Sequence, residues 1–369
     1  ALALLKEVTD GGPRHTGSGG EGKAAAFLQQ KLEGMGYQAR PQPFDIPTAE
    51  ASLQVLVPKE REVKAEAMEG SAEGRGEGAL VLAGLGRAGE FPAGVRGRVA
   101  LVERGEITFA DKAKAAAEAG ALALVVYNNR PGLFLGSLGR EGPLPALSIS
   151  QEDGQALRQG LEQGEVRVRL AVRRHQSPSQ NLWAALPGKS KNVLLLGGHY
   201  DTVPGTVGAH DNASGVAVLL ALAEALRGKQ YPFTVRFVFF GGEEVGLWGS
   251  RHLAEALSPQ ERENLLAALT FDAVGAPVPL RVAGTGELVD ALRSAAKERG
   301  LELERLERAI PSDYLSFLRL GIPSVLFTTP EFSVIHSPQD TPDRISGDSL
   351  GKAVLITLAF LENLASGGP

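Results

Sequence analysis

Six side chains in the second half of the chain have the types and spacing needed to bind metal ions and use them in hydrolysis. These are His199, Asp211, Glu243, Glu244, Asp272 and His336. Each has an ordinary explanation when taken alone: Asp211 fits the N-cap of a following helix, and Glu243 with Glu244 fits a solvated turn. However, two adjacent carboxylates behind an apolar strand repel each other unless positive charge lies nearby. Taken together, the six side chains favour a metal site.

Zinc accepts both imidazole and carboxylate ligands, and the chain contains no cysteine that could bind it as a thiolate. Two zinc ions about 3.5–4 Å apart can share one bridging carboxylate and one bridging water. Two histidines and three carboxylates divide evenly between such ions: each receives one histidine, one carboxylate and a share of the bridge. Glu243 is then left over beside Glu244, and it can act as a general base on the water.

Apolar strands must bring these side chains together, because the residues are far apart in the sequence. We predict strands over 193–197, 233–240, 269–274 and 322–327, and helices over 20–34, 214–227, 287–299 and 349–364. Strands that alternate with helices predict an α/β fold with a mostly parallel central sheet and helices on both faces. In such sheets functional groups gather at the carboxyl ends of the strands, and all six candidates lie at or near the ends of predicted strand–helix units.

The segment 48–174 differs in composition and interrupts this alternation of strands and helices. Short β-like runs at 79–82, 99–102, 122–126 and 166–172 alternate with glycine-rich turns and an alanine-rich helix near 111–118. The segment contains no histidine, so we do not expect it to hold the metal site. We therefore expect a small β-rich insert domain at 48–174 within a discontinuous catalytic domain formed by 1–47 and 175–369.

Composition excludes several classes of partner. The net charge of -5 is mild, and no basic patch interleaved with aromatic residues appears, so we expect no nucleic-acid partner. Apolar runs are too short to span a bilayer, so we expect no membrane span. The chain opens at Ala1 without an initiator methionine, as a processed secreted chain would, although a cytoplasmic location stays open.

The order of the motifs resembles the di-zinc aminopeptidase family, which includes bacterial leucyl aminopeptidases, aminopeptidase Y and glutamate carboxypeptidase. The motifs are His199-x-Asp201, Asp211-Asn212-Ala213-Ser214-Gly215, Gly242-Glu243-Glu244-x-Gly246, Phe271-Asp272, Ser312-Asp313-Tyr314 and Ile335-His336-Ser337-Pro338-x-Asp340-Thr341. Residues 13–18 resemble the opening of that family. The insert resembles a protease-associated domain, most clearly over 97–105 and 120–128.

This resemblance implies a role for each candidate in a site with two Zn²⁺ per chain. Asp211 bridges the ions, His199 and Asp272 complete one, and Glu244 and His336 complete the other. Glu243 is the general base that activates the attacking water.

The resemblance also implies three features around these ligands. Asp201 hydrogen-bonds the far nitrogen of His199 and fixes its tautomer. The peptide bond between Asp211 and Asn212 is cis. The hydroxyl of Tyr314 steadies the developing oxyanion, with a packed aromatic as the alternative.

The expected function is a zinc-dependent exopeptidase that removes N-terminal residues from peptides or small proteins. A related group of di-zinc carboxypeptidases and dipeptidases is the first alternative, but it usually carries a dimerisation domain before the last histidine. Only 64 positions separate Asp272 from His336, too few for that domain. Glutaminyl cyclases keep one zinc with fewer ligands, and receptor-like relatives lose ligands or the base, whereas this chain has the full set. An N-terminal amine needs acidic neighbours, which Glu243 and Asp272 could supply.

Overall fold

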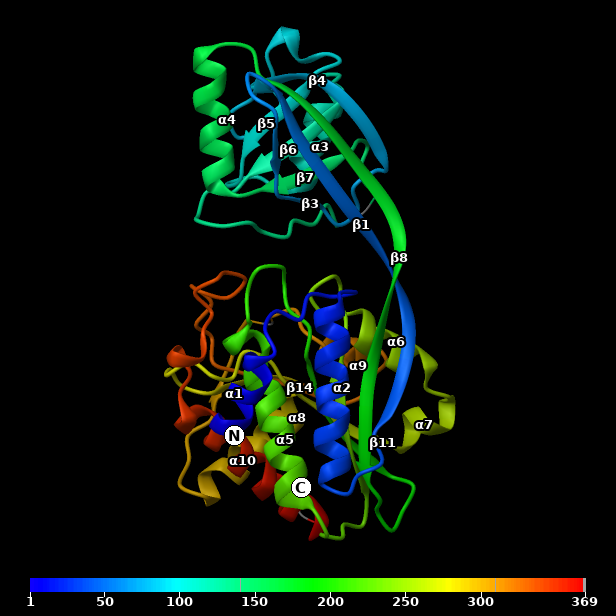
Figure 1. Ribbon diagram of the computed structural model, residues 1–369. Helices are drawn as coiled ribbons and strands as arrows, with labels where there is room; N and C mark the ends of the chain where they lie inside the picture. The colour runs from blue at the N-terminus through cyan, green and yellow to red at the C-terminus, as the bar shows by residue number, and fades with distance from the viewer. Residues whose placement is uncertain (140, 309, 368–369) are drawn as a thin grey trace. The chain divides into compact units, whose positions relative to one another are not determined.

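The computed structural model describes residues 1–139, 141–308 and 310–367 and divides into two units (Figure 1). The core unit comprises Ala1–Ile46 and Pro178–Pro369, and the insert unit comprises Pro47–Ser177. Two long strands, β1 (Arg40–Val57) and β8 (Arg167–Leu186), each begin in one unit and end in the other. No helix in the described parts of the chain is long and apolar enough to cross a membrane.

The sheet of the core unit has the strand order β13-β12-β14-β11-β9-β10-β8. Its strands are β9 (Val193–His199), β10 (Thr234–Phe240), β11 (Leu265–Phe271), β12 (Arg281–Gly284), β13 (Glu304–Arg305) and β14 (Ser324–Thr328), with the end of β8. The four central strands β14, β11, β9 and β10 are parallel, while β12 and β8 pair antiparallel to β14 and β10. The predicted mostly parallel sheet is confirmed, with antiparallel neighbours at its sides.

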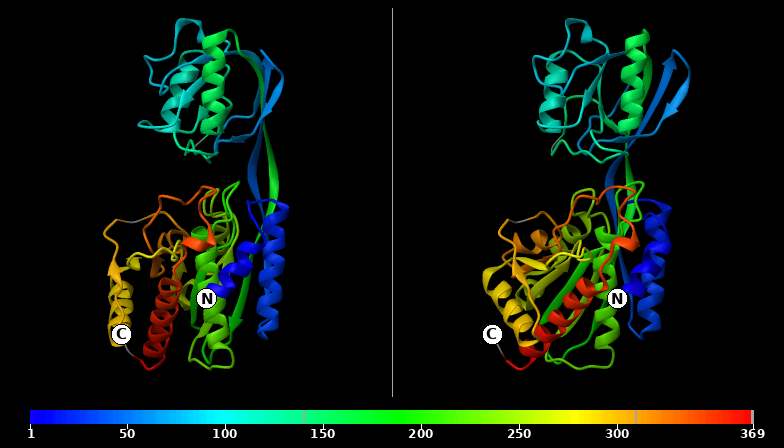
Figure 2. Two further views of the ribbon diagram at one scale, coloured as in Figure 1. Left: turned by 60° about the vertical axis from the view of Figure 1, so that its left-hand side comes forward. Right: turned by 90° about the vertical axis from the view of Figure 1, so that its left-hand side faces the viewer.

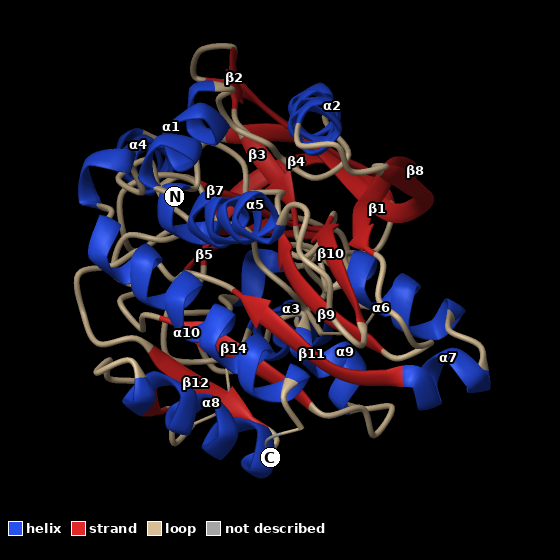
Figure 3. Cartoon of the chain, turned by 90° about the horizontal axis from the view of Figure 1, so that it is seen from below, coloured by secondary structure: helices blue, strands red, loops and turns tan. Residues whose placement is uncertain are grey.

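Helices cover both faces of this sheet, as predicted (Figure 3). They are α1 (Leu2–Asp10), α2 (Gly19–Gly34), α5 (Ser214–Leu226), α6 (Trp248–Ala256), α7 (Pro259–Asn264), α8 (Gly286–Glu298), α9 (Tyr314–Leu318) and α10 (Gly347–Ala365). Leu194 and Leu196 of β9 pack with α1, α2, α5, α8 and α10, whereas Leu195 packs with α6 and α9. Because successive side chains of a strand point to opposite faces, a continuous apolar run is buried on both sides.

The insert unit has the strand order β8-β4-β5-β6-β7-β3, which continues through β8 from the strands of the core unit. It contains β2 (Arg61–Val63), β3 (Ala65–Ala67), β4 (Gly74–Leu82), β5 (Val99–Glu103), α3 (Phe109–Glu118), β6 (Ala123–Tyr127), β7 (Ala146–Ile149) and α4 (Gln151–Gln163). Strands β4 to β7 are parallel. Helix α4 packs on one face and α3 on the other, each against a separate apolar cluster (Figure 2).

Several helices were not predicted, namely α1, α4, α6, α7 and α9. Helix α7 is only six residues long, and it is set by a capping box between Ser258 and Glu261 rather than by an apolar stripe. The strand expected at 269–274 instead runs over Leu265–Phe271, so Asp272 lies just beyond its end. This shift moves the carboxylate from within the sheet to its carboxyl edge.

Candidate active site

The carboxyl ends of the parallel strands bring the six candidate residues to one edge of the core sheet. His199 is the last residue of β9, Glu243 and Glu244 follow β10, and Asp272 follows β11 directly. His336 lies in the loop after β14. Because neighbouring parallel strands end at the same edge, residues separated by long stretches of sequence become neighbours there.

Asp211 lies at the centre of this cluster and is buried. Its Oδ1 is 3.1 Å from Nε2 of His199, and its Oδ2 is 3.0 Å from Nε2 of His336. The peptide bond to Asn212 is cis, as the resemblance implied. Each oxygen of one carboxylate therefore faces a different imidazole, which is the arrangement that a bridging ligand requires.

The remaining carboxylates divide between the two histidines. Oδ1 of Asp272 is 3.4 Å from Nε2 of His199, and Oε2 of Glu244 is 3.2 Å from Nε2 of His336. Ligand atoms of His199, Asp211 and Glu244 lie within 4.8 Å of one another, and so do those of His199, Glu243 and Asp272. The structure thus brings all six predicted residues together, with Glu243 on the side of His199 and Asp272.

Two buried atoms in the cluster lack a hydrogen-bond partner among the described residues: Nε2 of His199 and Oε1 of Glu244. A buried polar atom without a partner costs about 1–3 kcal/mol, and more when it is charged. A divalent cation would satisfy both atoms and offset the repulsion between the carboxylates. The donor set, imidazole and carboxylate without thiolate, suits zinc.

Asp201 supports the cluster, although not through the contact predicted for it. Nδ1 of His199 is 3.3 Å from the backbone carbonyl of Asp201 and 3.6 Å from its carboxylate, so the carbonyl is the closer acceptor. The carboxylate instead accepts hydrogen bonds from the hydroxyl of Thr16 at 2.7 Å and from the backbone N–H groups of Glu243 and Glu244 at 3.1 and 3.2 Å. It therefore fixes the turn that carries the adjacent glutamates.

Asn212 and Asp340 hold the turn on which Asp211 lies. The side-chain amide of Asn212 donates to the carbonyl of Phe271 at 2.8 Å, which ties the turn to the end of β11. The carboxylate of Asp340 accepts from the backbone N–H groups of His210 and Asp211 at 2.6 and 3.0 Å. Asp340 belongs to a motif that the sequence shows, but its partner 129 positions earlier could not be read from that motif.

The electrostatics of the cluster are those of acids crowded beside two imidazoles. Burial acts to raise the pKa of Asp211, but the neighbouring imidazoles of His199 and His336 outweigh it and hold that pKa well below its usual value. Burial, with the charge of Asp211, raises the pKa of Glu244 to about 7. Burial also raises the pKa of Glu243 well above its usual value, which His199 partly opposes. Strongly shifted pKa values of this kind are typical of functional sites.

Arg14 is a buried cation that the sequence analysis did not single out. Its guanidinium donates to the carbonyls of Tyr200, Val207 and Gly208 at 2.6, 2.7 and 3.1 Å, and the side chain is 1% exposed. Burial lowers its pKa to about 10, opposed by the carboxylates of the cluster, Asp201 first. Arg14 lies between two helices, outside regular secondary structure, so no periodic pattern in the sequence predicts that it is buried.

Tyr314, predicted to lie near the site, is buried at the start of α9 beside Asp313. Its hydroxyl has no hydrogen bond within the described residues, and burial raises its pKa. Asp313 is fully buried with both carboxylate oxygens unpartnered among those residues. Its pKa rises to about 7 through burial, which His199 opposes.

Comparison with known proteins gives two family matches. Residues 181–361 match the model of peptidase family M28, and residues 71–157 match the PA domain. The match to peptidase family M28 includes all six residues of the cluster, but it does not include the supporting residues Arg14 and Thr16. The second match lies within the insert unit.

Individual relatives agree with these matches. Aminopeptidase YwaD of Bacillus subtilis is 31% identical over 98% of this chain and 84% of its own length. A probable leucine aminopeptidase 2 of Aspergillus oryzae is 35% identical over 66% of this chain, which spans about half (53%) of that relative. A zinc aminopeptidase structure from Bacillus subtilis superposes with a TM-score of 0.90 at 29% identity, covering 98% of this chain and 94% of the other. The chain belongs to peptidase family M28 and carries a PA domain.

Proposed function

We propose that this chain is an aminopeptidase that removes N-terminal residues from peptides at a site holding two zinc ions. The observation that carries the proposal is the carboxylate of Asp211, whose two oxygens face two different imidazoles at 3.1 and 3.0 Å. The relatives described as aminopeptidases, and the zinc aminopeptidase of similar structure, support the same conclusion.

In this proposal Asp211 would be shared between the two ions, with His199 and Asp272 holding one and Glu244 and His336 holding the other. Zinc at such positions acts as a Lewis acid that polarises a carbonyl and lowers the pKa of water. The two partnerless atoms, Nε2 of His199 and Oε1 of Glu244, fall one on each side of the bridge. This distribution favours two ions over one.

Glu243 serves as the general base in this scheme. Its backbone N–H is held at 3.1 Å by the carboxylate of Asp201, which fixes the position of the side chain at the end of β10. Its carboxylate takes a proton from the attacking water and later delivers it to the leaving amine. Burial raises the pKa of Glu243 above its usual value, which makes its carboxylate a stronger base for the proton of the water.

Acidic groups around the cluster favour an amine over a carboxylate as the recognised end of the substrate. Glu243 and Asp272 lie on the side of His199, and Asp313 adds a buried carboxylate close to them. A carboxypeptidase would need a free guanidinium, but Arg14 uses its donors on three backbone carbonyls. The hydroxyl of Tyr314 is proposed to steady the oxyanion, which Tyr314→Phe would test through a loss in kcat.

Two measurements test the proposal. Leucine p-nitroanilide should be hydrolysed, whereas its N-acetyl derivative should be cleaved at least 100-fold more slowly because the free amine is lost. Elemental analysis of protein purified without chelator should find close to two zincs per chain. Preferential cleavage of the acetylated substrate, or full activity with one ion, would overturn the corresponding part. A secreted location remains part of the proposal and is tested by fractionating the source cells.

A further inference from the structure

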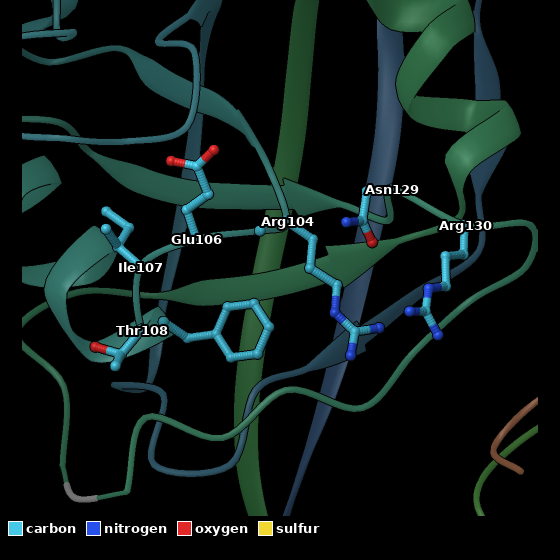
Figure 4. A pocket seen from close by; sticks show the side chains of 8 residues that line it. Arg104, Glu106, Ile107, Thr108, Asn129 and Arg130 are labelled. Atoms are coloured by element: carbon cyan, nitrogen blue, oxygen red, sulfur yellow. The ribbon is translucent and has the colours of Figure 1, made fainter. Parts of the chain in front are cut away.

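The insert unit contains an open cavity of about 410 Å³ that the metal chemistry does not use (Figure 4). Its lining residues are Arg104, Gly105, Glu106, Ile107, Thr108, Phe109, Asn129 and Arg130. Arg104 directly follows β5, and Arg130 follows β6 by three positions. Strands β5 and β6 are parallel neighbours, so the cavity lies at the carboxyl edge of this sheet, where ligands bind in α/β folds.

Two arginine side chains converge in this cavity. Figure 4 shows the side chains of Arg104 and Arg130 extending downward, with their guanidinium groups beside each other below the amide of Asn129. Arg104 is held in place: its Nη1 donates to Oδ1 of Asn128 at 3.2 Å, and its guanidinium lies 4.7 Å from the ring centre of Phe134. Burial, and then the charge of Arg130, lower the pKa of Arg104.

Neither arginine has a carboxylate partner among the described residues, because the acids nearby are engaged elsewhere. Glu106 pairs with Arg87, and in Figure 4 its carboxylate points away from Arg104. Asp111 accepts the hydroxyl hydrogen bond of Thr108 at 2.6 Å. The cavity therefore concentrates two positive charges that form no ion pair with any described carboxylate, and its one lining acid, Glu106, pairs with Arg87.

We propose that this cavity binds a carboxylate group of a peptide. Guanidinium groups match the planar geometry of a carboxylate and can hold both of its oxygens. The cavity volume exceeds what a small inorganic anion needs and suits one or two residues of a peptide. Ile107 and Phe109 offer apolar surface to the rest of such a ligand, and the amide of Asn129 offers a further donor.

The choice of a peptide rests on the proposed peptidase function, since every linear peptide ends in a carboxylate. An acidic side chain would present the same group, so the two sources need to be distinguished by experiment. Phosphate shares the charge of a carboxylate but lacks the apolar part that the lining of the cavity fits. The insert unit would thus contribute substrate binding without contributing to the chemistry.

Calorimetric titration of the full chain tests this proposal on the Glu243→Gln background, in which hydrolysis of bound peptide is strongly slowed. The probes are an N-acetylated tripeptide of alanine and leucine, its C-terminal amide, and an amidated analogue with a central glutamate. Acetylation disfavours binding through the amine. Arg104→Gln and Arg130→Gln are compared with Arg75→Gln, which makes the same charge change at an exposed arginine on β4, outside the cavity.

We expect saturable binding of the free-carboxylate peptide, at least 10-fold weaker in Arg130→Gln and unchanged in Arg75→Gln. Arg130 is exposed and its side chain has no hydrogen bond or ion pair within the described residues, so Arg130→Gln should fold and tests the proposal even if Arg104→Gln unfolds. Equal binding by all three peptides, unchanged binding in Arg130→Gln, or competition by inorganic phosphate alone would overturn the proposal. If the amidated peptide with a central glutamate binds although the plain amide does not, the proposal is supported and an acidic side chain can supply the carboxylate. Hydrolysis of leucine p-nitroanilide is measured separately, so failure here leaves the peptidase function standing.

Discussion

The core and insert units share a plan, parallel strands with polar residues at their carboxyl ends, but differ in what their buried polar groups do. In the insert unit, buried Lys112 donates to the carbonyls of Leu85 and Glu103, and buried Ser148 donates to the carbonyl of Phe134. In the core unit, Nε2 of His199 and Oε1 of Glu244 are buried without a partner among the described residues.

This difference separates structural from chemical use of buried polarity. A satisfied buried group specifies one packing arrangement, whereas an unsatisfied cluster is costly unless a ligand completes it. No set of three metal-ligating side chains is found within the described residues of the insert unit. Within the described residues, the insert unit thus satisfies its buried side-chain polar atoms internally, while the core unit keeps buried atoms that a metal ion would satisfy.

The largest effect expected from this comparison comes from exchanging the two adjacent glutamates for glutamine. Glu243→Gln should keep both zincs and lower kcat by about 10²–10⁴-fold, because only the general base is lost. Glu244→Gln should lose activity by losing metal. Steady-state kinetics and elemental analysis of both variants check this. Loss of zinc in Glu243→Gln with retention in Glu244→Gln would reverse the two assignments.

Arg14→Met tests whether the buried cation of the core unit supports the acidic cluster. The substitution leaves the carbonyls of Tyr200, Val207 and Gly208 without their donor and removes positive charge beside Asp201. We expect a loss of about 3–5 kcal/mol in the free energy of unfolding, as for one member of a buried charge network. Urea unfolding followed by the fluorescence of Trp183 and Trp248, both in the core unit, measures it. A loss below 1 kcal/mol would show that Arg14 is dispensable.

Removal of metal should destabilise the core unit and spare the insert unit. Zinc at 100-fold above its dissociation constant adds about 2.7 kcal/mol to the stability of the state that binds it. The carboxylates of Glu244 and Asp211 outweigh burial and raise the pKa of His336 to about 11 in the metal-free protein, so protons compete with zinc there. Zinc affinity should therefore fall steadily as the pH drops below about 11, so it should be lower at pH 6 than at pH 8. Thermal unfolding with and without chelator, followed by the fluorescence of the core tryptophans, checks the loss of stability. Chelator titration at pH 8 and pH 6 checks the zinc affinity. An unchanged unfolding temperature would contradict the first effect, and equal affinities would contradict the second.

The sequence predicts the core sheet and all six members of the cluster because both depend on local patterns. Apolar runs such as 237–240 define buried strands, and the polar residues that follow them must meet at one sheet edge. The supporting contacts could not be predicted in the same way. Arg14 meets the carbonyl of Tyr200 across 186 positions, and the amide of Asn212 meets the carbonyl of Phe271 across 59. Such pairs depend on the final packing of loops, for which no periodicity exists.

The contact predicted for Asp201 shows that sequence patterns do not specify such contacts even between residues two positions apart. The motif correctly places Asp201 beside His199, yet the backbone carbonyl rather than the carboxylate lies at hydrogen-bonding distance from Nδ1. A spacing of two residues identifies a neighbour but not which of its oxygens turns inward. That choice follows from Thr16 and the glutamate N–H groups, which draw the carboxylate towards themselves.

The smallest effect on catalysis is expected from Lys112→Met, the counterpart of Arg14→Met in the insert unit. Methionine keeps the apolar stem but removes the ammonium, leaving the carbonyls of Leu85 and Glu103 without their donor. The free energy of unfolding of the insert unit should fall by about 1–3 kcal/mol. Hydrogen exchange of β5 and β6 measures this loss, since both tryptophans lie in the core unit.

Zinc content and kcat for leucine p-nitroanilide should stay within twofold of wild type in Lys112→Met, because the substitution leaves the cluster intact. The matched Arg14→Met should instead change zinc affinity as well as stability. If Lys112→Met also loses zinc, or if kcat falls by 10-fold, the two units are energetically coupled. The division between a structurally complete insert and a metal-dependent core would then fail.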